Sequence, residues 1–221
     1  MIARTLLTET IHPLFDSVNE KEAYEYMHTH KIFHVPVINE DSKLCGLLAE
    51  EDIYPPDAHK IIGKHPEKYS TVKVFAHQHF FEICELVFNQ HISSVPVVEE
   101  NDAYIGLITA HDLIKYFTRI YSFHNPGAII VLSVLIQDYS LSEISHIIEE
   151  NDAKIISMYT DIENDSQNMD IIIKLNTQEI SSILQTFTRY EYTVKTHFEG
   201  YDKLQAMYKE RVESILNYIN I

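Results

Sequence analysis

The alternation of apolar and polar positions changes period several times along the chain, and each change predicts a boundary between a helix and a strand. Residues 80–90 place apolar side chains at three- and four-residue steps, which is typical of a helix lying on a sheet. Residues 92–98 are β-branched and predict a strand, and Pro96 puts it at or near a sheet edge because proline cannot donate to a ladder. A polar turn, a strand at residues 103–108 and a helix from residue 109 to about 121 complete this unit.

The same unit occurs earlier in the chain. The tripeptide Val-Pro-Val stands at residues 35–37 and again sixty positions later, at residues 95–97. Other residues keep the same offset: Ile32 with Ile92, Gly46 with Gly106, Leu47 with Leu107, and Asp52 with Asp112. A constant offset without a gap indicates a tandem duplication, so we predict repeats at residues 1–60 and 61–122.

The first repeat is predicted to contain a helix at residues 20–29 and strands at residues 32–38 and 44–48. Its exit helix opens near Glu50 and is cut short, because Pro55-Pro56 cannot continue an α-helix. One repeat leaves a sheet face uncovered. We therefore expect the two repeats to pack on each other with approximate twofold symmetry.

Charge and cysteine content narrow the function classes. The chain has 17 lysines and arginines against 33 aspartates and glutamates, a formal charge of −16, so it lacks the basic footprint of a nucleic-acid-binding protein. Its 2 cysteines, Cys45 and Cys84, form no CxxC pair and do not suggest a disulfide scaffold. The most apolar stretch, residues 128–136, is far shorter than the roughly 20 residues that span a bilayer. We expect a cytoplasmic protein without nucleic-acid or membrane partners.

A polar constellation follows the second Val-Pro-Val. After Gly106, a helix start supplies free backbone N–H groups, the Thr109 hydroxyl and the Asp112 carboxylate at one place. A hydroxyl and a carboxylate suit a ribose diol. The alternative is that Thr109 and Asp112 only cap the helix, as these residue types often do.

The Val-Pro-Val strand, the acidic turn and the segment Gly106-Leu107-Ile108-Thr109-Ala110-His111-Asp112 resemble CBS domains, which occur in tandem as a Bateman module. The resemblance covers roughly residues 1–122. It implies a regulatory site for an adenosyl ligand (AMP, ADP, ATP or S-adenosylmethionine) and no required cofactor. Nucleotide-binding members use the matching threonine and aspartate for ribose and the backbone before Pro-Val for the base. In this chain those positions are Ile92, Ser93, Ser94, Val95, Pro96, Thr109 and Asp112.

The first repeat departs from this pattern. The equivalent site would consist of His34, Pro36, Ala49 and Asp52, with alanine in place of the threonine. The neighbouring carboxylates of Glu50 and Glu51 stand where phosphates would lie. We expect this site to be weak, or to take a ligand with little negative charge.

The C-terminal part begins after a turn cluster at residues 123–127. Its predicted elements are a strand at 128–136, a helix at 140–151 with Ser140 and Glu143 as a capping box, strands at 154–162 and 169–175, a helix at 177–189 and a strand at 192–198. This βαββαβ order predicts a ferredoxin-like domain. The whole chain is thus predicted to have an α/β (α+β) fold, a pseudo-twofold repeat pair followed by this domain.

The segment at residues 127–198 resembles ACT regulatory domains in element order. Members that bind amino acids usually have glycine at the first strand-to-helix turn, whereas this chain has Gln137, Asp138, Tyr139 and Ser140 there. We therefore favour sheet pairing in a homodimer over amino-acid binding. Residues 199–221 predict an amphipathic helix that packs on its own chain or on a partner.

Other chemistries have little support in the sequence. The pairs His28-x-His30 and His77-x-His79 lie at predicted helix ends, where the side chains diverge, so we predict no metal site. No nucleophile elbow, phosphate loop or dinucleotide fingerprint is present, which favours a non-catalytic protein. The domain order resembles the acetoin-utilisation family of regulatory proteins. It suggests a sensor that relays ligand binding, through packing or dimer changes, to a regulated enzyme or transporter. The alternative is a constitutive dimerisation scaffold with degenerate pockets.

Overall fold

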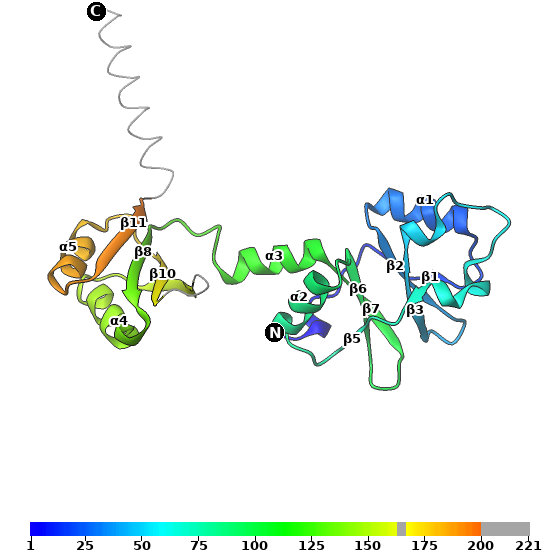
Figure 1. The fold of residues 1–221 in the computed structure, drawn as a ribbon, viewed down its shortest axis with the longest axis horizontal. Coiled ribbons are helices and arrows are strands. Elements are labelled where there is room, and N and C mark those ends of the chain that lie inside the picture. The colour runs from blue at the N-terminus through cyan, green and yellow to red at the C-terminus, as the bar shows by residue number, and fades with distance from the viewer. Residues whose placement is uncertain (163–166, 200–221) are drawn as a thin grey trace, which may run out of the picture. The chain divides into compact units, whose positions relative to one another are not determined.

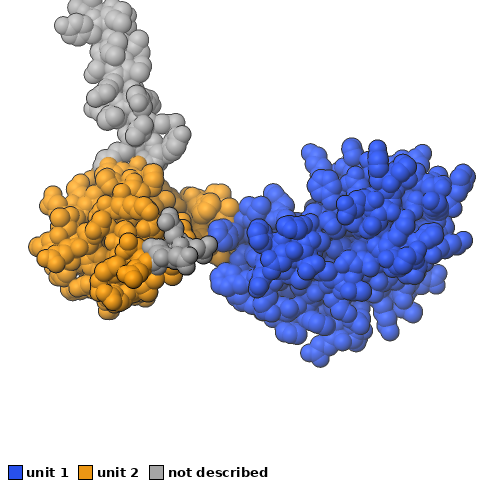
Figure 2. All heavy atoms as spheres, viewed as in Figure 1, with its two compact units in different colours: residues 1–117 blue, residues 118–221 orange. Residues whose placement is uncertain are grey.

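The chain divides into two compact units, Met1–Phe117 and Thr118–Ile221 (Figure 2). The computed structural model describes residues 1–162 and 167–199. The amphipathic helix predicted at residues 199–221 therefore lies outside the described residues, except for Glu199. No described helix combines the length and the apolar character that crossing a membrane requires.

The first repeat forms a four-stranded sheet with one long helix (Figure 1). Its elements are β1 (Leu14–Phe15), α1 (Glu20–His30), β2 (His34–Ile38), β3 (Leu44–Ala49), the 3-10 turn η2 (Glu50–Ile53) and, after η3 (Ile62–Lys64) and η4 (Pro66–Lys68), β4 (Tyr69–Ser70). The sheet order is β1-β2-β3-β4, with β1 parallel to β2 and the other pairs antiparallel. The predicted truncation of the exit helix is confirmed, because η2 ends just before Tyr54-Pro55-Pro56.

The second repeat has a three-stranded sheet of order β5-β6-β7. Its elements are β5 (Val74–Phe75), α2 (Phe80–Asn89), β6 (Ser94–Val98), β7 (Tyr104–Thr109) and α3 (Ala110–Ile120). Pro96 was predicted to lie in a strand at or near a sheet edge, and β6 is the middle strand of three, next to both edges. Proline is tolerated in this strand because β5 is short and pairs only with Val97 and Val98, so no hydrogen bond from Pro96 to β5 is needed.

Each repeat is completed by a segment outside its main helix and strands, which we call its arm. Residues 1–8, including η1 (Ala3–Thr5), pack on the second repeat, where Ala3 and Leu6 join the buried core and the Thr8 N–H donates to the Leu107 carbonyl at 2.8 Å. Residues 61–70 pack on the first repeat, and Ile62 lies in its core. The second repeat is therefore discontinuous in sequence, whereas the first is continuous through residue 70.

The glycine of each repeat lets its arm pass closely. A Cβ atom on Gly46 would lie 2.6 Å from Tyr69 Cβ, and one on Gly106 would lie 2.9 Å from Leu7 Cδ2. Both glycines also have positive φ, 154° and 158°. The recurrence of glycine at the sixty-residue offset thus has a steric cause.

The expected pseudo-twofold packing is present within the first unit. The Tyr104 N–H donates to the Ser42 carbonyl at 3.1 Å, and the Leu44 N–H donates to the Asp102 carbonyl at 3.3 Å. Position 42 corresponds to 102 and position 44 to 104, so the two bonds are symmetry equivalents. Strands β2 and β6 contact each other between the two sheets.

The second unit is a ferredoxin-like domain, as predicted (Figure 1). Its elements are β8 (Ile129–Leu135), η5 (Ile136–Asp138), α4 (Leu141–Glu150), β9 (Ile155–Asp161), β10 (Asn168–Leu175), α5 (Ser181–Arg189) and β11 (Thr193–Phe198). The antiparallel sheet has the order β11-β8-β10-β9. Alternate residues of β8 and β10 are buried against both helices in one core, which explains the apolar alternation in their sequences.

The helix caps of this unit follow the sequence in part. Ser140 Oγ accepts from the Glu143 N–H at 3.3 Å, which confirms Ser140 as the N-cap of α4. The Glu143 carboxylate instead accepts from the Tyr192 hydroxyl at 2.7 Å, tying α4 to the residue before β11. This long-range bond replaces the predicted return half of the capping box.

Candidate functional site

The predicted pair Thr109 and Asp112 meets at the start of α3. Asp112 Oδ2 accepts from the Thr109 N–H at 2.9 Å and from the Thr109 hydroxyl at 2.5 Å, and Thr109 Oγ1 accepts from the Asp112 N–H at 3.1 Å. This is a reciprocal helix cap. The cap fixes the position of the carboxylate, and both of these bonds to it use Oδ2.

The predicted base-binding segment, residues 92–96, is mostly buried. Ile92, Val95 and Pro96 are buried, so only their backbone could reach a ligand. The Ser93 carbonyl accepts from the Ala110 N–H at 2.9 Å, which joins this segment to the start of α3. The structure thus brings residues 93 and 109–112 to one place.

Ser93 and Ser94 also connect the second repeat to His34 of the first. Ser94 is fully buried, and its hydroxyl donates to the His34 carbonyl at 2.7 Å. The Ser93 N–H donates to His34 Nδ1 at 3.2 Å, and the Phe33 N–H donates to Ser93 Oγ at 3.0 Å. Residues 33 and 34 correspond to 93 and 94, so equivalent positions meet across the pseudo-twofold axis.

The electrostatics of His34 follow from this position. Burial lowers the pKa of the imidazole below its usual value, while the carboxylates of Glu51 and Asp52 act in the opposite direction. Because Nδ1 accepts the Ser93 N–H, we assign the proton of the neutral ring to Nε2.

The first repeat contains an open pocket of about 700 Å³, which we call the first-repeat pocket. Among the predicted site residues, His34 and Ala49 line it. Pro36 is buried within β2, and Asp52 is exposed in η2, so neither lines the pocket. The remaining lining residues are Phe33, Glu50, Glu51, Tyr54, Gln90 and His91.

Several of these residues were not predicted as site residues, although the repeat offset could have identified some of them. Phe33 is the equivalent of Ser93, and Glu50 of Ala110, so the frame used for the second repeat also points to them. Gln90 and His91 come from the end of α2 in the other repeat. Their approach depends on the packing of the two repeats, which no local pattern encodes.

The predicted turn of the ferredoxin-like unit is split by the structure. Asp138 lines a hollow of about 530 Å³ together with Glu143, Glu191 and Tyr192. Gln137 is exposed, Tyr139 packs against the core, and Ser140 caps α4. The four turn residues therefore do not converge on one site.

No cluster of three or more potential metal ligands occurs within residues 1–162 and 167–199. In the second histidine pair, His79 Nδ1 accepts from the Phe81 N–H at 3.3 Å in the cap of α2. This contact is structural.

Two solved structures are similar to part of this chain. A crystal structure of a CBS domain pair/ACT domain protein from Thermotoga maritima is similar with a TM-score of 0.48 and 17% identity, over 54% of this chain and 98% of that chain. A Vibrio cholerae protein named for acetoin utilization is similar with a TM-score of 0.48 and 20% identity, over 56% of this chain and 95% of that chain.

Among curated proteins, an inosine-5'-monophosphate dehydrogenase from Aquifex aeolicus is 32% identical over 98 residues, which is 43% of this chain and 20% of that protein. The chain spans only about a fifth to a quarter of the first curated relatives that it matches. The model of the CBS domain matches residues 10–54 and 69–119. The N-terminal unit of this chain is a tandem pair of CBS domains.

Proposed function

We propose that this chain is a non-catalytic regulatory protein that binds an adenosyl ligand (AMP, ADP, ATP or S-adenosylmethionine) at its second CBS repeat. The observation that supports this most directly is the pairing of Thr109 and Asp112 at the start of α3. The cap holds the Asp112 carboxylate in place through Oδ2, so Oδ1 is oriented without further ordering and can accept from a ribose hydroxyl.

The surroundings of this pair suit a nucleoside. Helix α3 has 11 residues, so its N-terminus favours anionic groups nearby. The backbone of residues 92–94 lies next to the helix start through the bond between Ala110 and Ser93. A flat base can hydrogen-bond to such a backbone segment while the ribose meets Asp112.

Helix α3 connects the proposed ligand site to the second unit along the chain, so it could relay ligand binding. It begins at the proposed site, and the residues that follow it contact the sheet of the second unit. The Tyr121 ring lies 5.5 Å from the Tyr159 ring, and Lys174 Nζ donates to the Ser122 carbonyl at 2.6 Å. A ligand that favours one position of α3 would shift the equilibrium of these contacts by its difference in affinity for the two states.

Isothermal titration with AMP, ADP, ATP and S-adenosylmethionine tests the site. At least one should bind, and Asp112→Ala should weaken binding at least tenfold, whereas Asp41→Ala in the exposed turn before β3 should not. The matching thermal-shift screen should show a stabilisation of about 2.7 kcal/mol at a ligand concentration 100 times the dissociation constant. If none of the four binds, Thr109 and Asp112 serve only as a cap.

We propose that the ACT-like second unit forms the homodimer through its sheet and that it does not bind an amino acid. The regulated protein would be an enzyme or a transporter. Light scattering at micromolar concentration should give twice the chain mass, and a monomer would contradict this proposal.

A constitutive dimerisation scaffold is the second candidate. It is favoured by the fact that Ser93 and Ser94 already hydrogen-bond to Phe33 and His34, as structural links between the repeats. A scaffold predicts a dimer whose mass and thermal midpoint do not respond to any adenosyl compound. The regulatory proposal predicts a response.

A further inference from the structure

The first-repeat pocket differs in chemistry from the site proposed in the second repeat. Glu50 and Glu51 contribute two carboxylates to its wall, and the described residues that line it include no lysine or arginine. The alanine at position 49 removes the hydroxyl that Thr109 supplies in the other repeat. The pocket therefore repels phosphates.

The backbone of this pocket does not compensate for the carboxylates. The exit turn η2 has only 4 residues, too few to build the dipole that an 11-residue helix has. The Glu50 N–H, which opens the turn, already donates to the Phe33 carbonyl at 2.9 Å. The equivalent bond from the Ala110 N–H to the Ser93 carbonyl opens α3, so the two helix starts differ in the length of the element and in its charge.

Two aromatic rings border the same pocket and remain open to solvent. Phe33 is 63% exposed and Tyr54 is 67% exposed, so both rings are accessible to a ligand. A cation that lies beside an aromatic ring and a carboxylate is attracted both by the quadrupole of the ring and by the negative charge of the carboxylate. His34, which burial keeps neutral near pH 7, does not neutralise the carboxylates.

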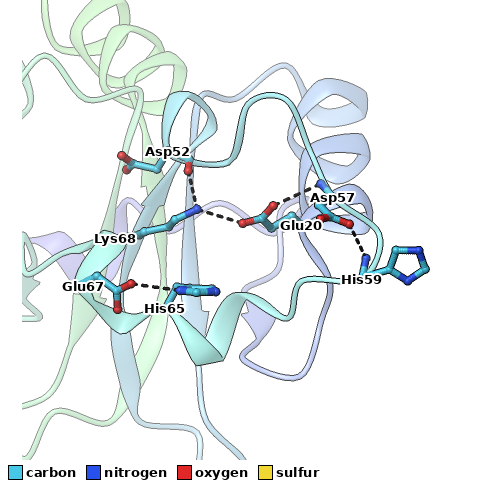
Figure 3. Close-up of polar contacts among 7 residues, drawn as sticks. All are labelled: Glu20, Asp52, Asp57, His59, His65, Glu67 and Lys68. Carbon is cyan, nitrogen blue, oxygen red and sulfur yellow. Dashed lines mark hydrogen bonds and ion pairs between the residues drawn. The ribbon is translucent and has the colours of Figure 1, made fainter.

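The loop that carries Tyr54 is held at both ends by one buried ion pair (Figure 3). Lys68 Nζ donates to Glu20 Oε1 at 3.0 Å and to the Asp52 carbonyl at 2.8 Å. The second oxygen of Glu20 accepts from the Asp57 N–H at 3.2 Å. The Tyr24 ring, 6.0 Å from that of Tyr54, supports the loop between these two points. The aromatic wall is thus preformed.

Of the two repeats, only the first has this clamp of Glu20 and Lys68. Glu20 corresponds to Phe80 at the sixty-residue offset, and Lys68 precedes Tyr69 in one arm as Leu6 precedes Leu7 in the other. Phe80 packs against Tyr116 of α3, with ring centroids 4.6 Å apart, where the first repeat has its loop. The first repeat has therefore replaced an apolar helix contact with a charged clamp that leaves room for a pocket.

We propose that the first-repeat pocket binds an organic cation of the quaternary ammonium or sulfonium type, held between the carboxylates of Glu50 and Glu51 and the rings of Phe33 and Tyr54. This site is separate from the adenosyl site at Asp112. Glu20 and Lys68 are positioning residues for its wall.

Paired probes of equal shape and different charge test the proposal on the full chain. By calorimetry, choline should bind about tenfold more tightly than its neutral isostere 3,3-dimethyl-1-butanol. S-adenosylmethionine should exceed S-adenosylhomocysteine in the same way when both are measured in the Asp112→Ala background. Millimolar choline should also raise the thermal midpoint.

The variants separate charge from structure. Glu50→Gln with Glu51→Gln should reduce the preference for the cation to nearly onefold, whereas Glu40→Gln with Asp41→Asn, which removes the same charge from the turn before β3, should leave it unchanged. Tyr54→Phe should bind choline as the parent does, and Tyr54→Ala should lose about tenfold.

Three results would overturn the proposal: equal binding of choline and its isostere, no binding of either cation at millimolar concentration, or equal effects of the two double variants. Binding of choline that does not respond to Asp112→Ala supports it even if no nucleotide binds. Failure of the adenosyl site and failure of this inference are thereby distinguished.

Discussion

Replacing Lys68 with methionine should destabilise the first unit far more than the same replacement at Lys21. Glu20, the partner of Lys68, has a side chain only 3% exposed, whereas the Lys21–Glu25 pair is 59% and 64% exposed with a 3.9 Å separation. Removing one partner of a buried ion pair typically costs about 3–5 kcal/mol, and exposed pairs contribute about 0–1 kcal/mol.

The expected magnitude for Lys68→Met lies below that range. Lys68 is itself 29% exposed, so water can reach the vacated position, and Glu20 keeps its bond from the Asp57 N–H. We expect a loss of about 2–3 kcal/mol for Lys68→Met and less than about 0.5 kcal/mol for Lys21→Met. With a urea slope of about 1–3 kcal/mol per molar, the midpoint of the first unit falls by about 0.7–3 M.

Urea titration followed by circular dichroism measures this, with the two units fitted as separate transitions because a two-unit chain need not unfold in one step. Hydrogen exchange of a peptide covering residues 52–57 reports the loop directly, and its protection should fall in Lys68→Met alone. Adding Glu20→Gln should recover part of the stability, since it removes the unpaired carboxylate. A double variant less stable than Lys68→Met, or equal losses at Lys68 and Lys21, would refute the reasoning.

Three further outcomes are expected. Gly106→Ala should cost about 1–3 kcal/mol, because its Cβ would meet Leu7 Cδ2 at 2.9 Å; Leu7→Ala in the same chain should restore part of the thermal midpoint, and no restoration would contradict the steric account. Ser94→Ala should cost about 1–3 kcal/mol by urea titration, since it leaves the His34 carbonyl without the 2.7 Å bond at a fully buried site. Burial lowers the pKa of His34, so the unfolded chain binds the proton more readily than the folded chain. The contribution of His34 to the free energy of unfolding should be fully present above about pH 6.5 and should be lost as the pH falls from there toward the folded pKa. The fall should be smaller in His34→Gln, and equal pH profiles of the two proteins would exclude the effect.

The duplication was predictable because the matching residues of the two repeats are separated by a constant offset. The same offset predicts that the two repeats have the same fold. The ferredoxin-like order was predictable because each of its elements has its own period. Three two-residue strands, β1, β4 and β5, were missed, since two residues establish no alternation. Yet Leu14–Phe15 and Val74–Phe75 are sixty positions apart, and the offset itself could have identified β1 and β5.

The site was predictable where its residues are close in sequence. Thr109 and Asp112 are three positions apart, so a helix start brings them together. His34 and Ser93 meet only because the two repeats pack face to face, and Glu20 meets Lys68 only because an arm returns to α1. Such contacts depend on tertiary packing, which hydrophobic periodicity does not predict.

The arms also determine the order in which the chain can complete its repeats during synthesis. The first repeat lacks Ile62 and β4 until residues 61–70 have left the ribosome. Residues 1–8, made first, have no partner surface until β7 and its Leu107 carbonyl have emerged about a hundred residues later. The first repeat can therefore be completed once residue 70 has been made, whereas the second repeat requires its later strands to return to residues 1–8.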